Sequence, residues 1–542
     1  MPEGRSDQEL AESFADFFMN KIQNIRDTLN DIPAYEPTSQ ASCSLSKFHP
    51  LTSEQVKEII ISLSTKSCEL DVIPTKILKE ILPEILSVIT RIVNLSLTQG
   101  QFSKNWKTSV IRPQLKKIGL DLIEANYRPV SNLPFLSKVL EKAALKQFME
   151  YSNSNHLMPD YQSAYRKHFS CETALVKLMD DLLWSMEKQQ VTALMAIDLS
   201  AAFDTVDHNV LISVLNVNFG INGEVLQWFD SYLRPRDCKV KVNSETSSVR
   251  DLPFSVPQGS CAGPVLYLAY ASTMQNAVPD DVQIHGYADD HAMKKSFNAN
   301  DRSDENKAIK CLQQSALSVK EWMDKNRLQM NSSKTEFILF GSCQHLQKCY
   351  TKNLYVCEEV VKLSHEIKYL GVHLDRHLTL KHHIQLKCRT AIWNLQRIKL
   401  VRNVLTKDAC EVLVLGTVMA HLDYANALYI GLPNCDIMKL QRIQNVASKL
   451  ILRTSDDSIT RLKKLHWLPV QLRIKHKVLT LLFKALKGES PSYLRDLVSL
   501  HPVQRPGLRS EFIYKRLMVP STKEKDTIYL LLLNIHMQVS SS

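Results

Sequence analysis

Apolar residues recur at helical spacing near the start of the chain, and strand-like runs follow in its middle. Apolar side chains at every third or fourth position predict an amphipathic helix over residues 10–29. Thr52 and Gln55, three residues apart, have the spacing of a capping box and predict the start of a second helix. A further helical pattern extends over residues 74–97.

Five short runs rich in branched apolar residues predict β-strands. They are residues 110–115, 191–197, 239–242, 282–286 and 336–340. Helical stretches separate several of these runs, which indicates a mixed α+β core over roughly residues 100–375. From His377 onward the pattern is helical.

The length and the charge of the chain add two constraints. A chain of 542 residues is too long for one ordinary core, so several subdomains are expected. The net charge is +11, and residues 376–500 hold 21 lysines and arginines against 8 acidic residues. This excess suits a phosphate-binding surface, but a solvated face of charged helices has the same composition, and charge alone does not decide between them.

Composition also excludes some classes of protein. Twelve cysteines occur without a Cys-x-x-Cys pair, which argues against a zinc ribbon or a disulfide framework and predicts a cytoplasmic or nuclear protein, or both. No membrane association is expected, because no signal-peptide pattern follows Met1 and the apolar run at residues 528–533 is too short to span a bilayer. Glycine-rich phosphate loops are absent from the sequence, so other groups must hold any phosphate.

The first candidate for chemistry is Asp198, on which a strand-like apolar run ends before a predicted helix. An acid at the end of a strand faces a cleft rather than the core, which suits a metal ligand. The alternative is that Asp198 or Ser200 caps the following helix, and the stretch taken alone favours that alternative.

The second candidate is the pair Asp289 and Asp290, which follows another strand-like run. Neighbouring residues on a strand point to opposite faces, so both carboxylates can serve one site only at a tight turn. A buried acidic pair is costly unless a cation neutralises it. Beside Asp198, the pair would give hard oxygen ligands suited to two Mg²⁺ ions, which support in-line phosphoryl displacement. An ordinary surface turn is the alternative.

Three motifs in a fixed order resemble the catalytic motifs of one enzyme family. They are the segment 198–208, the Val-Pro-Gln-Gly run at 256–259 and Tyr-Ala-Asp-Asp at 287–290. Together they resemble the reverse transcriptases of non-LTR, LINE-type retrotransposons. The order of the motifs is the one that the family uses.

Segments outside these motifs extend the resemblance over roughly residues 45–500. Residues 106–132 are similar to the fingers segment, residues 326–335 to the region after the catalytic turn, and residues 368–372 to the primer grip. Residues 465–473 resemble a segment downstream of the polymerase in vertebrate elements of chicken-repeat-like clades. The endonuclease that normally precedes the polymerase is expected to be missing.

The resemblance implies roles for the acidic motifs. Asp198 and Asp289 would be the principal metal ligands, with Asp290 and the backbone carbonyl of Leu199 in support. They would hold two Mg²⁺ ions, for which Mn²⁺ is a possible substitute, and no small-molecule cofactor beyond the metal is implied. Phe203 would lie under the sugar and exclude a 2′-hydroxyl, with core packing as its alternative role.

Nucleotide-binding residues are implied in the same way. Gln258 and Gly259 would shape the pocket over the nucleotide and the template, and Lys334 would orient the leaving pyrophosphate unless it is an ordinary surface lysine. Three cations would bind the triphosphate: Lys116, Lys117 and Arg128.

The fold implied is the α+β right-hand polymerase. Its expected segments are an N-terminal connector helix and linker (1–45), fingers (46–150), a palm (151–375), a basic helical thumb and downstream region (376–500) and a divergent tail (501–542). Trp393 and Trp467 could stack on nucleic acid, but packing inside the thumb is the predicted role of both.

The predicted activity is RNA-directed DNA synthesis. A primer 3′-hydroxyl would be extended with dNTPs on an RNA template, so the partners are an RNA template, a DNA primer or RNA–DNA hybrid, and dNTPs. Ser255, Ala262 and the pair at 271–272 depart from the family, which usually has glycine, leucine and an Ile-Asn-Asp-like ending there. These departures favour, as alternative, a decayed remnant that binds nucleic acid without polymerising. A two-metal nuclease is a third hypothesis, against which the Pro-Gln-Gly motif argues.

Overall fold

The computed structural model describes residues 5–356 and 359–498. Contacts divide the chain into two compact units, each assembled from three stretches. Unit 1 comprises the described parts of residues 1–165, 198–279 and 315–331, and unit 2 those of residues 166–197, 280–314 and 332–542. Three elements contribute residues to both units: β3 (Val191–Ser200), α10 (Arg302–Lys325) and β9 (Gln329–Phe340).

Unit 1 combines helices with a small sheet. Its helices are α1 (Asp7–Asp27), α2 (Ser53–Ser62), α3 (Thr75–Glu80), α4 (Leu82–Thr98), α5 (Phe135–Ser154), α7 (His208–Val217), α8 (Gly223–Leu233) and α9 (Ala262–Tyr270). Its strands are β1 (Ser109–Leu115), β2 (Tyr127–Asn132), β4 (Asp237–Val242), β5 (Glu245–Thr246) and β6 (Arg250–Asp251). They form one sheet in the order β2-β1-β4-β5, with β6 paired to β4.

Helix α1 covers one face of this sheet. It begins at a capping box in which Ser6 and Glu9 satisfy each other's backbone N–H groups. Its apolar stripe packs on Ile111, Tyr127 and Val240 of the strands, and the rings of Phe14 and Tyr127 meet edge to face at 5.0 Å. The helix predicted over residues 10–29 is therefore confirmed, as is the capping box that begins α2.

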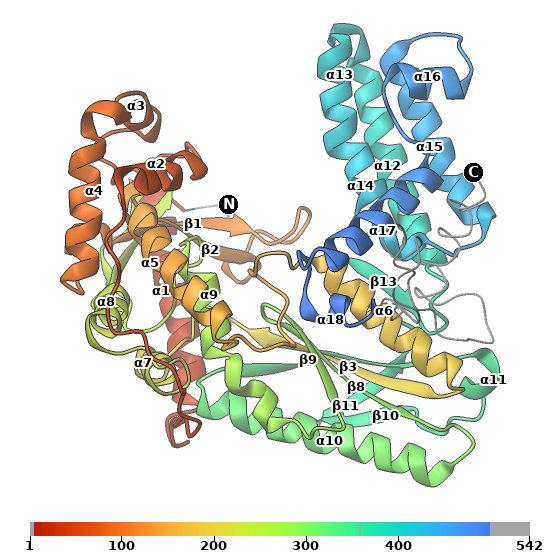
Figure 1. The fold of residues 1–542 in the computed structure, drawn as a ribbon, viewed down its shortest axis with the longest axis horizontal. Coiled ribbons are helices and arrows are strands. Elements are labelled where there is room, and N and C mark those ends of the chain that lie inside the picture. Colours follow the sequence, from red (N-terminus) through yellow and green to blue (C-terminus); the bar gives the residue numbers. More distant parts are fainter. Residues whose placement is uncertain (1–4, 357–358, 499–542) are drawn as a thin grey trace, which may run out of the picture. The chain divides into compact units, whose positions relative to one another are not determined.

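Unit 2 is built on a six-stranded sheet of order β10-β11-β9-β3-β8-β7. The strands not yet named are β7 (Gln283–Tyr287), β8 (Asp290–Phe297), β10 (Asn353–Val356) and β11 (Glu359–Ser364), and a separate hairpin joins β12 (Glu366–Tyr369) to β13 (Val372–Asp375). Helix α6 (Cys171–Glu187) packs on the sheet, with Leu178 and Leu182 in one core with Leu194 of β3 (Figure 1). The first five residues of β3 are buried, which explains the unbroken apolar run in the sequence.

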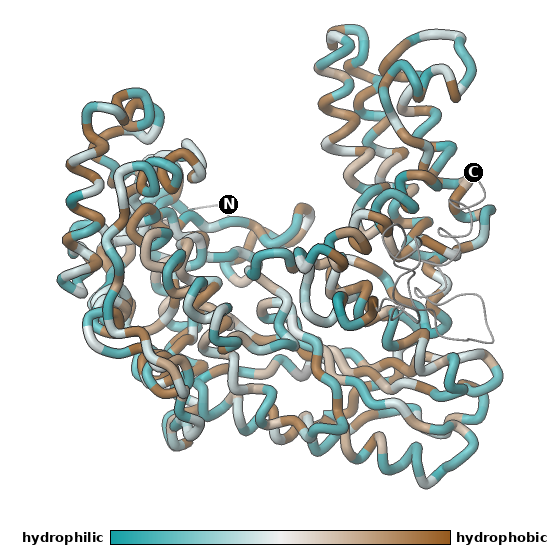
Figure 2. Tube along the Cα trace, viewed as in Figure 1, coloured by the Kyte–Doolittle hydropathy of each residue, from teal (hydrophilic) through white to brown (hydrophobic). Residues whose placement is uncertain are grey.

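The remainder of unit 2 is helical. It contains α11 (Cys343–Leu346), α12 (Lys381–Val401), α13 (Lys407–Val414), α14 (Ala420–Asp423), α15 (Asn434–Leu452), α16 (Ser458–Lys464), α17 (Val470–Leu486) and α18 (Ser492–Arg495). Leu395 and Ile398 of α12 share a core with Leu440 and Ile443 of α15. Figure 2 shows hydrophobic and hydrophilic residues interspersed along these helices, as one-sided packing requires.

Most predicted elements are present, with two differences. The strand pattern at 336–340 is the end of the longer β9, and β3 continues through Asp198 to Ser200 instead of passing into a helix. The next helix, α7, begins only at His208 and is capped by Asp207, so neither Asp198 nor Ser200 is a helix cap. The α+β prediction is confirmed, while the tail at 501–542 lies outside the described residues. None of the described helices has the length and apolar character of a membrane span.

Candidate active site

The two neighbouring aspartates lie at a tight turn, as their adjacency predicts. Tyr287, the last residue of β7, pairs with Asp290, the first of β8, so that only Ala288 and Asp289 form the turn. Ala288 has a left-handed backbone with φ of 58°. A non-glycine residue in this region costs roughly 1–3 kcal/mol, and such strain tends to be kept at functional turns. The turn therefore removes the alternation of faces that would separate the two acids on a regular strand.

A buried histidine, His291, supports this turn through a hydrogen bond. The ring nitrogen Nδ1 of His291 lies 3.1 Å from the carbonyl oxygen of Asp289. Burial lowers the pKa of His291 to about 4, so the ring is neutral at physiological pH and its Nδ1–H donates to that carbonyl. In the antiparallel pair of β3 and β8, His291 is also the register partner of Ile197. Asp198 is the next residue of β3 after this partner.

Asp198 has a polar neighbour in unit 1. The side-chain amide nitrogen of Asn331, near the start of β9, lies 3.4 Å from its Oδ2. Leu199, whose carbonyl is a predicted metal ligand, is buried. An amide donor next to a carboxylate helps to orient it without neutralising its charge, which suits a metal ligand.

The segment after Asp198 is joined to the second motif by a ladder of hydrogen bonds. The backbone N–H of Val256 donates to the carbonyl of Phe203 at 2.9 Å, and that of Ser255 donates to Val206 at 3.0 Å. His208 adds a side-chain contact of 2.8 Å from Nε2 to the carbonyl of Ser255. Two of the three motifs found in the sequence thus form one backbone structure within unit 1.

This ladder gives a physical reason for the glycine that the family usually has at one position. Ser255 has φ of 91°, in the region where a Cβ atom is unfavourable and glycine is not. Serine at this place therefore adds backbone strain, while the two hydrogen bonds of the Ser255 backbone, to Val206 and from His208, remain in place. The departure from the family pattern costs stability and removes no functional group.

The Pro-Gln-Gly loop also docks on strand β2. The backbone N–H of Ser131 in β2 donates to the carbonyl of Gln258 at 2.7 Å. A Cβ atom on Gly259, whose φ is 118°, would lie 2.3 Å from the carbonyl oxygen of Ser131. Gly259 is required because the two backbones approach too closely for any side chain.

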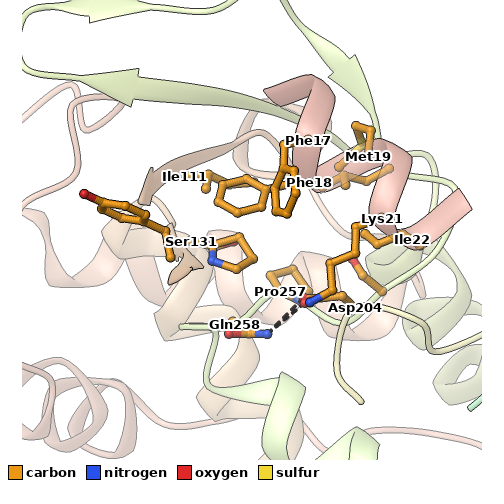
Figure 3. Close-up of a pocket in the computed structure, with 14 residues that line it drawn as sticks. Phe17, Phe18, Met19, Lys21, Ile22, Ile111, Ser131, Asp204, Pro257 and Gln258 are labelled. Carbon is orange, nitrogen blue, oxygen red and sulfur yellow. Dashed lines mark hydrogen bonds between the residues drawn. The ribbon is translucent and has the colours of Figure 1, made fainter. Parts of the chain in front are cut away.

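Asp204 holds the side chain of Gln258. The amide Nε2 of Gln258 lies 3.0 and 3.1 Å from the two carboxylate oxygens of Asp204, as Figure 3 shows. Burial raises the pKa of Asp204 to about 6, against the opposing effects of Lys21 and Gln258. The cavity lined by these residues and by Phe17 and Phe18 of α1 measures about 30 Å³, which is room for a water molecule and not for a nucleotide.

The predicted triphosphate cations lie on the β1–β2 hairpin. Arg128 pairs in register with Gln114, so Lys116, two residues further along, shares the exposed face of the hairpin with it. The Nζ of Lys116 donates to the carbonyl of Ala125 at 2.6 Å, and Lys117 is exposed in the loop beyond β1. The opposite face, with Tyr127, packs on α1. Arg128 and Lys116 therefore face away from α1.

The remaining predicted residues have separate environments. The ring of Phe203 is 4.7 Å from that of Tyr267, and Lys334 is exposed on β9. Trp467 is buried, as predicted, but Trp393 is 55% exposed and the guanidinium of Arg397 lies 4.6 Å from its ring centre. The prediction that Trp393 packs inside the helices is wrong, because α12 presents this position to solvent.

Sequence reasoning missed two contacts near the site. It gave no role to Asp204 as the partner of Gln258, or to Asn331 as the neighbour of Asp198. Both residues lie inside segments that resemble the family, and this was the only signal for them in the sequence.

Comparison with known proteins agrees with this geometry. Residues 115–374 match the family model described as reverse transcriptase (RNA-dependent DNA polymerase). Residues 115–374 form a reverse transcriptase domain. This domain includes the acidic turn, the Pro-Gln-Gly loop and Asp198, and the right-hand polymerase fold is that of its family.

Relatives of the reverse transcriptase domain are encoded by mobile elements. The chain is 29% identical over 370 residues to the RNA-directed DNA polymerase from mobile element jockey of Drosophila funebris, covering 66% of this chain and 39% of the relative. It is 27% identical to the probable RNA-directed DNA polymerase from transposon X-element of Drosophila melanogaster, over 69% of this chain and 40% of the relative. The chain thus spans about two fifths of the length of these relatives.

A solved structure of apo telomerase from Candida tropicalis, truncated from its C-terminal domain, is also similar. It matches with a TM-score of 0.36 and 12% identity, over 58% of this chain and 62% of that chain.

Proposed function

We propose that this chain is an RNA-directed DNA polymerase of a non-LTR retrotransposon, which extends a primer 3′-hydroxyl with dNTPs on an RNA template. The observation that carries the proposal is the two-residue turn with Asp289 and Asp290 at its end, inside a reverse transcriptase domain. The Mg²⁺ ligands would be Asp198, Asp289, Asp290 and the carbonyl of Leu199. These hard oxygens fit Mg²⁺, and the orienting contacts of Asn331 and His291 resemble those that support metal ligands.

The chain's own residues would bind and orient the substrates. When bound, the metal ions supply electrostatic stabilisation of charge in phosphoryl transfer. Arg128 and Lys116, on one exposed face, would bind the triphosphate, and Phe203 would exclude a 2′-hydroxyl by its bulk. The Pro-Gln-Gly loop, held in place by the contact of Gln258 with Asp204, would shape the pocket over the nucleotide.

We also propose the domain assignment given by the resemblance, with fingers at 46–150, a palm at 151–375 and a basic helical thumb at 376–500. The thumb would bind the template–primer hybrid through its phosphates, largely without regard to sequence. Trp393, exposed beside Arg397, is a candidate stacking residue on this surface. Residues 465–473 support a place in chicken-repeat-like clades, which a phylogeny of the domain would test.

The test of the polymerase is primer extension by the purified chain on an RNA template with Mg²⁺ and four dNTPs. Asp289→Asn should reduce the rate at least about a hundredfold, since a metal ligand contributes several kcal/mol to the transition state. Asp281→Asn is the matched control, because Asp281 precedes β7 and forms an exposed ion pair with Lys295. Equal extension by wild type and Asp289→Asn would refute the role of the turn.

The second candidate function is a catalytically decayed protein that still binds nucleic acid. The strained Ser255 is the observation that favours it, because strain in the motif ladder weakens the site's support. Folded wild-type chain that binds an RNA–DNA hybrid in a salt-dependent manner but does not extend it would establish this candidate.

A further inference from the structure

Three side chains outside the polymerase motifs converge on one point in unit 2. Nδ1 of His373 lies 2.8 Å from Oε1 of Glu366, and Nδ1 of His382 lies 2.8 and 2.7 Å from the two carboxylate oxygens of Glu366. One donor atom from each residue lies within 4.8 Å of the others. Two imidazole nitrogens and a carboxylate are therefore already gathered as a set of potential metal ligands.

The hairpin of β12 and β13 fixes two of these side chains on one face. Lys368 pairs with His373 and Glu366 pairs with Asp375, so Glu366 and His373 are diagonal neighbours across the hairpin. Residues of the opposite face, such as Leu374, are buried in the core of unit 2. Because the hairpin is anchored by this core, Glu366 and His373 cannot move apart freely.

The loop after β13 brings His382 back over the hairpin. The carboxylate of Asp375 accepts hydrogen bonds from the backbone of His377, Thr379 and Leu380 and from the hydroxyl of Thr379, at 2.8–3.1 Å. Leu378 and Leu380 in this loop have left-handed backbones, with φ of 56° and 54°. A left-handed backbone at two leucines is energetically unfavourable, and the hydrogen bonds to Asp375 offset this strain. The loop is thus held in a strained form that places the first turn of α12 beside the hairpin.

We propose that Glu366, His373 and His382 bind one divalent transition-metal ion, zinc in the first place. Imidazole with carboxylate is a donor set that suits zinc, and three protein ligands leave a fourth position for water. Donors at about 2.0–2.2 Å from a tetrahedral ion are about 3.3–3.6 Å apart, so the present contacts between the histidines and Glu366 would open by roughly 0.5–0.9 Å. The side chain of His382 is 52% exposed, which gives an ion access from solvent.

The bound ion would tie the β12–β13 hairpin to the start of α12. The chain between Glu366 and His382 would become a closed loop, so metal should slow local opening of this segment. The competing explanation for the same distances is a pair of hydrogen bonds from two Nδ1–H groups to one carboxylate. If only these hydrogen bonds were present, zinc would not change the hydrogen exchange of the segment. The proposal does not rest on polymerase activity.

The experiment is zinc titration of the full-length, metal-stripped protein in a buffer with excess Mg²⁺, which occupies sites made of carboxylates. Wild type should bind one zinc ion that Mg²⁺ does not displace, and hydrogen exchange over residues 366–390 should slow on binding. Glu366→Gln, His373→Gln and His382→Gln should each weaken binding at least about tenfold. His365→Gln is the matched control, because His365 contacts Arg376 and not the cluster, and it should bind as wild type does.

Spectroscopy of the wild type keeps the test independent of how the variants fold. X-ray absorption at the zinc edge should show two imidazole nitrogens and oxygen at about 2.0–2.2 Å. A zinc site with thiolate sulfur, zinc binding unaltered in the three variants, or no saturable binding in the presence of Mg²⁺ would each overturn the proposal.

Discussion

A buried ion pair ties α1 to the reverse transcriptase domain, and its removal should release the helix. Arg26 of α1 donates from Nη2 to Oδ2 of Asp207 at 2.6 Å, and both side chains are nearly buried. The guanidinium of Arg26 also lies over the ring of Phe254, 3.5 Å from its centre. Asp207 in turn accepts the N–H groups of Asn209 and Val210 as the cap of α7. The substitution Arg26→Met keeps much of the apolar stem and removes the charge.

The expected loss follows from burial. Breaking one partner of a buried pair costs about 3–5 kcal/mol, because the other charge is left without compensation. The two N–H groups that cap α7 still satisfy part of the Asp207 carboxylate, so the lower end, about 3 kcal/mol, is expected. Every 1.4 kcal/mol is a factor of ten, so amide hydrogens of α1 should exchange on the order of a hundredfold faster.

Hydrogen exchange suits this prediction because it reports the local opening of α1 and needs no two-state unfolding of a two-unit chain. Arg250→Met, a change in strand β6, is a matched control because Arg250 also forms ion pairs with α1. Arg250 pairs with Glu12 and Asp16 of α1, but these side chains are 30–58% exposed, and exposed pairs contribute about 0.2–1 kcal/mol. Exchange should therefore rise less than about fivefold in the control. Equal effects of the two substitutions would refute the reasoning from burial.

The same pair predicts a pH dependence. Burial acts to raise the pKa of Asp207, but the hydrogen bond and charge of Arg26 hold it below its ordinary value of 3.8. A lowered pKa of an acid contributes stability that is present above the ordinary pKa and is lost as pH falls through the lowered one. Protection of α1 in wild type should therefore decline only below about pH 4, and Arg26→Met should remove this decline.

Three further predictions concern the site and the helical region. Ser255→Gly should stabilise unit 1 by about 1 kcal/mol, because glycine relieves the strain of a positive φ at some entropic cost. Slower hydrogen exchange of residues 255–259 would show this gain, and faster exchange would contradict the strain argument. Asp204→Asn should stabilise the protein at pH 7.5 by at most about 3 kcal/mol, because the pKa of Asp204 is raised to about 6 and its buried charge opposes folding above that pH. The gain in stability should vanish toward pH 4. A gain in urea midpoint that does not depend on pH would refute this reasoning. Trp393→Ala should weaken binding to an RNA–DNA hybrid about tenfold without loss of stability, because Trp393 is exposed. Trp467→Ala should destabilise the protein by about 3–5 kcal/mol, because Trp467 is buried. The reverse pattern would contradict these roles.

The sequence predicted the fold class and the acidic turn because local patterns determine both. Period-3.6 patterns marked α1, α2 and the stretch of α3 and α4, and apolar runs marked the strands β1, β3, β4, β7 and β9. Two adjacent acids can serve one site only at a turn. The extension of β3 through Asp198 was missed, because polar residues at 198 and 200 end the apolar run while the backbone continues to pair. Eight of the described strands were not predicted either, each two to eight residues long: β2, β5, β6, β8 and β10 to β13.

Other features depend on contacts between distant segments and have no local signal. The left-handed backbone at Ser255 is imposed by hydrogen bonds to Val206 and from His208. The exposure of Trp393 was mispredicted because α12 has apolar residues on several sides, and only the packing of α15 shows which side is inward. The domain boundaries along the chain stay a prediction.

The interleaving of the two units has a consequence for how this chain emerges from a ribosome. Unit 1 is not complete until residue 331 has been made, and the sheet of unit 2 lacks β9 until Phe340 has been made. The apolar strand β3 is synthesised long before β8 and β9, its neighbours in the sheet. Until then β3 lacks both neighbouring strands, and the apolar side chains that α6 does not cover stay exposed, which makes the nascent chain prone to aggregation. Truncated chains that stop before residue 340 should therefore accumulate as insoluble protein, however intact their catalytic motifs.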